Sequence, residues 1–86
     1  MPLYRFIIHG RIAGADAPNG FYTTRWCRAG DQEAAAKRAF DIVRADLNKR
    51  SPNWSISDLE VENGWRIPFW EIGRAPNRGY TFYNDD

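Results

Sequence analysis

Residues 30–52 read GDQEAAAKRAFDIVRADLNKRSP, and this stretch predicts one amphipathic helix that organises the rest of the chain. Asp31 is a suitable N-cap because its carboxylate can accept a backbone N–H from the first helical turn. The helical spacing of apolar residues runs from Gln32 to about Lys49, and Ser51-Pro52 ends it. We therefore expect one helical face to pack on a sheet. Ala36, Ala39, Phe40, Val43 and Leu47 have this helical spacing. The expected core comprises Ala36, Phe40, Val43 and Leu47 of the helix, with Phe6 and Ile8 beneath them.

The segments on either side of this helix have the composition of β-strands. Residues 14–20 contain Pro18 and Asn19-Gly20 and predict a loop between the first two strands. Asn63-Gly64 lies between two strand-like runs and predicts a two-residue type I′ hairpin turn. The expected strands are residues 3–12, 21–28, 54–62, 65–72 and 80–83.

These elements predict one α+β domain spanning residues 1–86. Its single helix packs on one face of a four- to five-stranded antiparallel sheet, with the chain order ββαββ(β). A right-handed, split β-α-β crossover places the third strand beside the first, which gives the spatial order 2-1-3-4(-5). Oppositely charged side chains would then face each other across these two strands and stabilise the pairing by about 0.2–1 kcal/mol per pair. They are Asp58, Glu60 and Glu62 on the third strand and Arg5, His9 and Arg11 on the first.

The aromatic residues are too many for one helix to cover. The chain has four Trp, four Tyr and five Phe, and all of them except Phe40 lie in strand-like segments. A helix of about 18 residues shields only about eight or nine outward-facing positions of a sheet. Because strand side chains alternate between the two faces, close to half of the aromatic side chains should lie away from the helix. An exposed apolar face of this kind usually marks an interface.

Two orientations of residues 21–28 are compatible with the sequence, since a shift of one residue exchanges the two faces of a strand. Either the odd-numbered or the even-numbered side chains face the helix. The small side chain of Cys27, close to the start of the helix, favours the odd-numbered set. This choice places Trp26 and Arg28 on the open face, and it requires Arg25 to extend its charged head to the sheet edge.

The composition excludes several classes of function. The net charge of +1 and the pI near 7.9 are too balanced for a dedicated phosphate-backbone binder or a polybasic membrane surface. No segment approaches the run of about 20 apolar residues that spans a bilayer, and the first residues lack the apolar region of a secretory signal. Cys27 is the single cysteine, so an internal disulfide is excluded and we expect a reducing, cytoplasmic location.

Residues that could support catalysis or bind a metal are few. His9 and Cys27 would form a thiolate–imidazole pair only if they faced each other, and neither belongs to a recognisable catalytic motif. The carboxylates of residues 58, 60 and 62 alternate along a strand and so predict a row and not a cage for a cation. We therefore expect a protein that is not an enzyme and that has no cofactor and no metal site.

The aromatic open face favours a small non-catalytic protein-binding module. Trp, Tyr and Arg most often dominate interface energies. The expected partner is another protein or a second copy of this chain. We expect an adaptor, an inhibitor or an immunity- or antitoxin-like protein. The order of two strands, a helix and a second strand group is similar to that of small bacterial immunity, antitoxin and adaptor proteins, although a shared fold does not fix a function. The expected contact residues are Tyr22, Trp26, Arg28, Trp70 and Tyr83.

Single-stranded nucleic acid is the alternative partner. The same aromatic side chains could stack on bases while Arg5, Arg11 and Arg28 contact phosphates. Residues 78–83, RGYTFY, partly match the RNP1 pattern, in which strand aromatics stack on RNA bases. Thr81, Tyr83 and Asp85 depart from that pattern.

Overall fold

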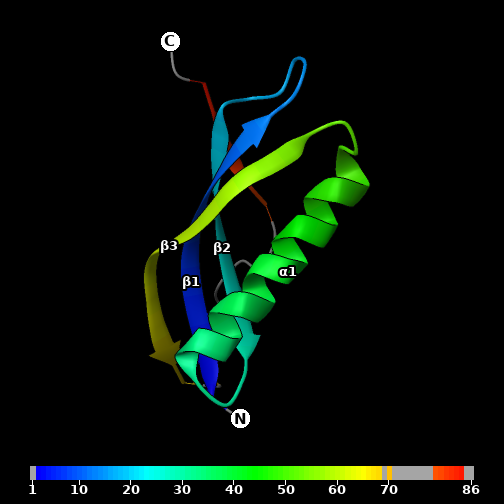
Figure 1. Cartoon of the computed structure of the whole chain (residues 1–86). Coiled ribbons are helices and arrows are strands. Elements are labelled where there is room, and N and C mark those ends of the chain that lie inside the picture. Colours follow the sequence, from blue (N-terminus) through cyan, green and yellow to red (C-terminus); the bar gives the residue numbers. More distant parts are fainter. Residues whose placement is uncertain (1, 69, 71–78, 85–86) are drawn as a thin grey trace.

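The computed structural model of the chain describes residues 2–68, 70 and 79–84. These residues form one helix that packs on one face of a four-stranded antiparallel sheet (Figure 1), so the predicted α+β class is confirmed. In chain order the elements are β1 (Leu3–Ala13), β2 (Gly20–Arg28), α1 (Gln32–Arg50), β3 (Ser55–Ile67) and β4 (Thr81–Tyr83). Within the described residues, no helix is long and apolar enough to cross a membrane.

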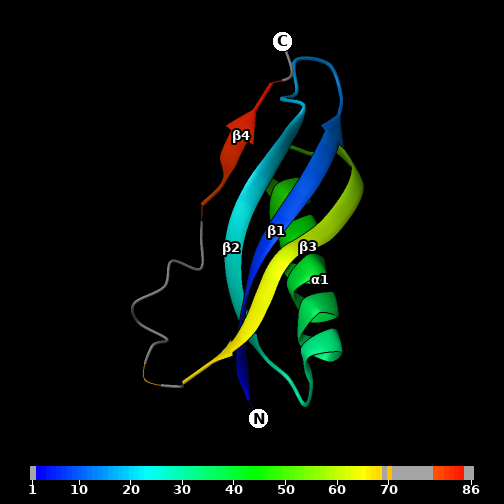
Figure 2. The ribbon, with the colours of Figure 1, turned by 90° about the vertical axis from the view of Figure 1, so that its left-hand side faces the viewer.

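The strand order is β3-β1-β2-β4, with β1 and β2 in the centre. The crossover through α1 places β3 beside β1, as the sequence predicts. The last strand is the exception, because β4 pairs with Gly20–Tyr22 of β2 at the opposite edge and does not extend the sheet beyond β3 (Figure 2). The predicted continuation 3-4(-5) is therefore wrong.

The predicted hairpin at Asn63-Gly64 is also wrong, because both residues lie inside the single 13-residue strand β3. Ile7 pairs with Asn63 and Ile8 pairs with Val61, which leaves Glu62 as an extra residue in a β-bulge. Residues 65–67 of the predicted next strand belong to β3 as well. Of the rest of that segment, residues 69 and 71–72 lie outside the described residues.

Gly64 is required for space and not for a turn. It pairs with Phe6 of β1, and a Cβ added at this glycine would lie 2.6 Å from Phe6 Cδ1. Phe6 is fully buried, so its ring has little room to withdraw. The glycine that suggests a turn in the sequence therefore serves packing against the core.

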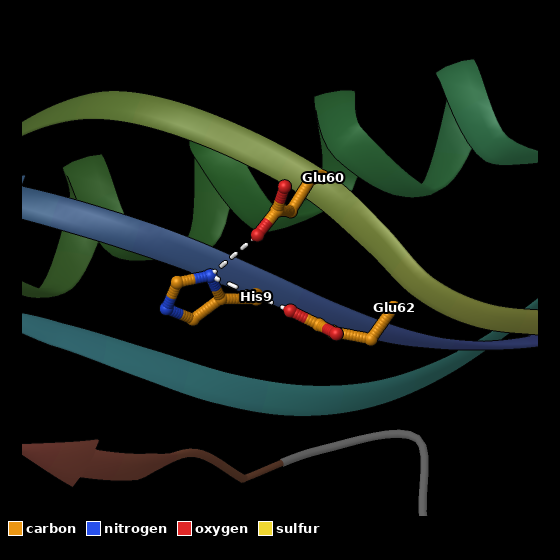
Figure 3. A group of neighbouring side chains, drawn as sticks. All are labelled: His9, Glu60 and Glu62. Carbon is orange, nitrogen blue, oxygen red and sulfur yellow. Dashed lines mark hydrogen bonds and ion pairs between the residues drawn. The ribbon is translucent and has the colours of Figure 1, made fainter.

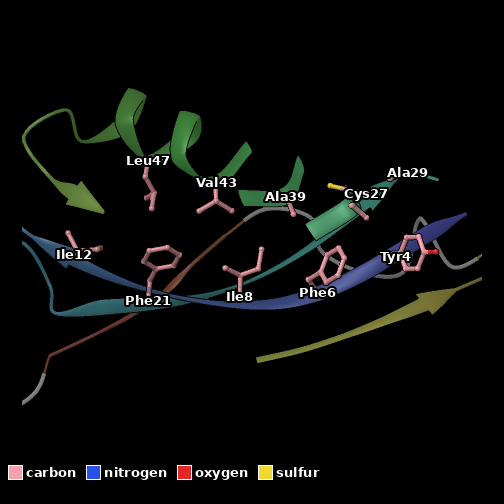
Figure 4. Packing of buried hydrophobic residues seen from close by; sticks show 11 residues of the cluster. Tyr4, Phe6, Ile8, Ile12, Phe21, Cys27, Ala29, Ala39, Val43 and Leu47 are labelled. Carbon is pink, nitrogen blue, oxygen red and sulfur yellow. The ribbon is translucent and has the colours of Figure 1, made fainter. Parts of the chain in front are cut away.

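The helix is capped as predicted, and its buried stripe is rotated slightly from the predicted one. The Asp31 carboxylate accepts a hydrogen bond from the Ala34 backbone N–H at 2.8 Å. Ala36 and Phe40, expected in the core, are only partly buried. The buried helical residues are Ala35, Ala39, Val43 and Leu47, which cover Phe6 and Ile8 of β1 and Phe21 of β2 (Figure 4).

A polar cluster ties the segment before β4 to the helix. The Tyr80 hydroxyl donates to Asp46 Oδ2 at 2.6 Å, and Arg50 Nε lies 3.2 Å from the same oxygen. The Arg25 guanidinium lies 5.0 Å from the centre of the Tyr80 ring and 3.8 Å from the Asp46 carboxylate. Arg25 is thus buried between β2, α1 and Tyr80. A buried guanidinium needs such a carboxylate and ring beside it to offset the loss of hydration.

This cluster shifts the titration of two of its members. The hydrogen bond from Tyr80, aided by that from Arg50, holds the pKa of Asp46 below its usual range. Burial, together with the hydrogen bond to Asp46, raises the pKa of Tyr80. Both shifts favour the ionised carboxylate and the neutral phenol, which is the pair that the observed hydrogen bond requires.

Replacing Gly64 with Ala should lower the free energy of unfolding by about 1–3 kcal/mol, because the new methyl group overpacks against Phe6. Urea denaturation measures the change. Gly30→Ala is the matched control, since nothing lies within 4 Å of a Cβ added there, and it should change stability by less than about 0.5 kcal/mol. Equal effects of the two substitutions would contradict the packing role of Gly64.

Replacing Asp46 with Asn should lower stability by roughly 1–2 kcal/mol at neutral pH, because the charge-assisted hydrogen bonds and the counter-charge to Arg25 are lost. The folded pKa of Asp46 lies below the unfolded value, so its contribution is present above about pH 4 and is lost as the pH falls through the folded pKa. The difference in unfolding free energy between the parent and the variant should therefore be constant from about pH 7 to pH 5 and should shrink below pH 4. Asp41→Asn, on an exposed face of the same helix, is the matched control and should change stability at neutral pH by less than about 0.5 kcal/mol.

Candidate functional site

The candidate site is the face of the sheet that α1 does not cover, called here the open face; α1 lies behind the sheet in Figure 2. On β2 the odd-numbered side chains from Phe21 to Cys27 are buried towards the helix. Of the two orientations compatible with the sequence, the favoured one is therefore confirmed. The open face carries Arg5, Ile7, His9 and Arg11 of β1, Tyr22, Thr24, Trp26 and Arg28 of β2, Asp58, Glu60, Glu62, Asn63 and Trp65 of β3, and Tyr83 of β4.

Rows of paired residues cross this face from β2 through β1 to β3. In the first row, Arg5 is paired with Trp26 on one side and with Trp65 on the other, and its guanidinium lies 5.8 Å from the Trp65 ring centre. Such a contact stabilises both the cation and the ring by about 0.5–1 kcal/mol. Trp65 was missed in the sequence because the Asn63-Gly64 pattern assigned it to a separate hairpin strand.

The predicted facing of acidic and basic residues is confirmed at two positions and wrong at the third. Glu60 pairs with His9 and Asp58 pairs with Arg11. Arg5 does not face Glu62, because the bulge at Glu62 shifts the register and brings Trp65 opposite Arg5.

His9 is the centre of the second row. Its Nδ1 lies 2.9 Å from Glu60 Oε1 and 3.8 Å from Glu62 Oε1 (Figure 3), and its Nε2 is hydrogen-bonded to the Tyr83 hydroxyl. The Tyr22 ring stacks beside the imidazole with 4.8 Å between the ring centres. The hydrogen bond from His9 holds the pKa of Glu60 below its usual range. The contact between His9 and Tyr83 depends on where β4 pairs, so no local sequence signal could reveal it.

The structure places the five predicted contact residues in two groups. Tyr22 and Tyr83 flank His9 towards the β4 end of the sheet, with Tyr22 43% exposed. Trp70 is 66% exposed and lies at the other end, where it lines a groove together with Arg28. Trp26, partly buried, lies between the two groups beside Arg5. At least two of the four aromatic side chains, Tyr22 and Trp70, are exposed as predicted.

The groove at the Trp70 end is an open hollow of about 840 Å³. Leu3 and Ile67 pair with each other and are almost completely buried, and two arginines, Arg28 and Arg66, belong to the lining. Its full lining is Pro2, Leu3, Arg28, Arg66, Ile67, Pro68 and Trp70. It therefore combines apolar walls with cationic side chains.

The structure does not bring Cys27 and His9 together. Cys27 points towards α1 and is 5% exposed, whereas His9 lies on the open face and pairs with Tyr22, five residues away along β2. Burial raises the pKa of the Cys27 thiol, which disfavours the nucleophilic thiolate. These two residues therefore do not form a nucleophile–base pair.

No family model matches the chain, and searches of curated proteins and of solved structures find no match either. The interpretation of the site therefore rests on its own geometry and chemistry.

Cys27 should react slowly with iodoacetamide at neutral pH in the folded protein, because its side chain is buried and its thiol is held protonated. Mass spectrometry of the alkylated chain measures the rate. His9→Ala should leave this rate unchanged, and unfolding in urea should increase it strongly. Rapid alkylation of the folded chain that His9→Ala abolishes would restore the thiolate–imidazole hypothesis.

Proposed function

We propose that this chain is a small non-catalytic protein-binding module and that its binding surface is the open face of the sheet. The observation that carries the proposal is the set of aromatic side chains on the side of the sheet that α1 leaves uncovered, above all Tyr22, Trp26 and Trp65. The exposed Trp70 adds to it in the groove that Arg28 also lines. Large aromatic side chains beside arginines supply most of the binding energy in typical protein interfaces.

The residues that line the groove indicate which kind of protein segment it would bind. Its apolar lining, in which Trp70 is the exposed member, suits an apolar side chain, and Arg28 and Arg66 of the same lining suit carboxylates beside that side chain. A protein segment with an apolar residue flanked by Asp or Glu is therefore the proposed ligand. Such a segment can belong to another protein or to a second copy of this chain.

Single-stranded nucleic acid is less well supported. Arg5 between two tryptophans resembles a stacking platform with a cation beside it. However, Asp58, Glu60 and Glu62 lie along β3, at one side of the open face, and repel phosphates. Tyr83, from the segment with the partial RNP1 pattern, packs on His9 and Tyr22 at the sheet edge and so has less ring surface available for bases.

Trp70→Ala and Arg28→Glu should each weaken binding of the native partner by more than about tenfold, because each removes a central contact of the proposed groove. The partner is first identified by affinity capture from the host, and binding is then measured with the purified pair. Ile42→Ala is the control, since Ile42 is an exposed large apolar residue on α1, away from the open face. Raising the salt concentration from 50 to 200 mM should change the affinity by only a few-fold, in contrast to the steep loss typical of nucleic-acid complexes.

Multi-angle light scattering of the purified chain tests the second-copy alternative. A dimer that becomes monomeric with Trp70→Ala but not with Ile42→Ala would identify the partner as a second copy. A partner whose affinity is reduced by Ile42→Ala and not by either groove substitution would contradict the open face as the binding surface.

A further inference from the structure

Three groups that can bind a metal ion meet at one point on the open face. His9 Nδ1 lies 2.9 Å from Glu60 Oε1 and 3.8 Å from Glu62 Oε1 (Figure 3). Their potential ligand atoms all lie within 4.8 Å of one another. One imidazole and two carboxylates from neighbouring strands therefore converge, although the two carboxylates repel each other.

The β-bulge explains why both carboxylates reach the same imidazole. Glu60 pairs directly with His9, so it faces this residue in any regular ladder. Glu62 would pair with Ile7 in a regular ladder, but here it is the extra residue between Val61 and Asn63. Bulges commonly re-aim a side chain next to a functional site. The sequence suggested a simple acidic row, and the bulge converts part of that row into a cluster around His9.

We propose that His9, Glu60 and Glu62 form a binding site for one divalent transition-metal ion of the Zn²⁺ class. Zn²⁺ binds imidazole nitrogen and carboxylate oxygen at about 2.0–2.2 Å, so ligand atoms around one ion lie roughly 3.0–3.5 Å apart. The two distances from His9 Nδ1, 2.9 and 3.8 Å, bracket this range, and small side-chain rotations reach it. A mixed set of one nitrogen and two oxygens favours Zn²⁺, Co²⁺ or Mn²⁺ over Ca²⁺, which takes six to eight oxygens.

Tyr83 supplies the outer contact that a metal-binding histidine normally has. When Nδ1 binds a metal it carries no proton, so the ring proton is on Nε2 and can be donated to the Tyr83 hydroxyl oxygen. Without a metal, Nδ1–H donates to Glu60 and Nε2 accepts from the Tyr83 hydroxyl. Tyr83 is therefore a positioning residue that holds the ring in either state, and Tyr22 stacks on the same ring.

The site is open to a metal ion and to water. The Glu60 and Glu62 side chains are 63% and 45% exposed, whereas the His9 side chain is only 13% exposed. The fixed imidazole thus presents one nitrogen to two accessible carboxylates, and water completes the coordination. Three protein ligands with a water-filled position are typical of open zinc sites.

The test is isothermal titration calorimetry, in which the tag-free full chain is titrated with Zn²⁺ alone in a buffer that does not bind metals. We expect one Zn²⁺ per chain. Glu62→Gln should weaken the affinity at least tenfold and is the main variant, because this exposed residue can be replaced without disturbing the core. Asp58→Asn is the matched control on the same strand and face, and it should change the affinity less than twofold.

Nitrogen NMR of the His9 ring provides a readout that does not depend on affinity. Zn²⁺ should move the ring to the form with Nε2 protonated, and Tyr83→Phe should weaken Zn²⁺ binding by about tenfold, as outer-shell contacts usually do. The proposal is overturned if Zn²⁺ does not bind stoichiometrically or if Asp58→Asn weakens binding as much as Glu62→Gln. Zn²⁺ binding that persists in the His9→Ala variant also overturns it, as does a His9 ring spectrum that does not change when Zn²⁺ is added. These outcomes do not depend on the protein partner.

Discussion

The packing of α1 across one face of the sheet is the constraint on which the rest of the structure depends. Ala35 and Ala39 let the helix backbone approach the sheet, and Val43 and Leu47 continue the same stripe over the rings and methyl groups below. A single helix can cover only one face of the sheet. The open face follows directly from this limit, and so does the exposure of aromatic side chains that strand alternation places there.

The buried guanidinium of Arg25 is the second determinant of the architecture. A charge in this position needs an anion and a polarisable ring, and Asp46 and Tyr80 supply them from the helix and from the segment before β4. This requirement brings the end of the chain to the β2 edge. Tyr83 then reaches over Gly20 to the His9 imidazole, where a Cβ at position 20 would collide with its phenol ring. The cluster of Arg25, Asp46 and Tyr80 on the helix side of the sheet thus helps to position the Tyr83 side chain on the open face.

The open face and the groove at its end contain two regions of different chemistry. Its Trp70 end is apolar with arginines in the lining, which suits a protein segment that carries carboxylates. Its β4 end is a histidine held by two glutamates and a tyrosine, which suits a metal ion. Arg5 between Trp26 and Trp65 separates the two regions. The two proposals therefore concern different residues of one surface and can succeed or fail independently.

Features encoded by neighbouring residues were accessible from the sequence alone. The N-cap at Asp31, the helical spacing up to Leu47, the two first strands and the orientation of Trp26 all depend on local capping, periodicity and side-chain size. The sequence also determined that one helix must leave aromatic side chains uncovered. The buried stripe differs from the predicted one because Ala35 is fully buried, whereas Ala36 and Phe40 are only partly buried.

Only the tertiary structure decided the path of the C-terminal half. Asn63-Gly64 is a hairpin signal when read locally, but Gly64 is there because Phe6, far away in the chain, occupies the space of a side chain. The edge on which β4 pairs depends on the contact of Tyr80 with Asp46, and the His9 cluster depends on the bulge at Glu62. Each of these is a contact between distant segments. The energy of such a contact depends on residues that are far apart in the chain. Local patterns therefore predicted the helix and the first strands but not the pairing of the C-terminal strands.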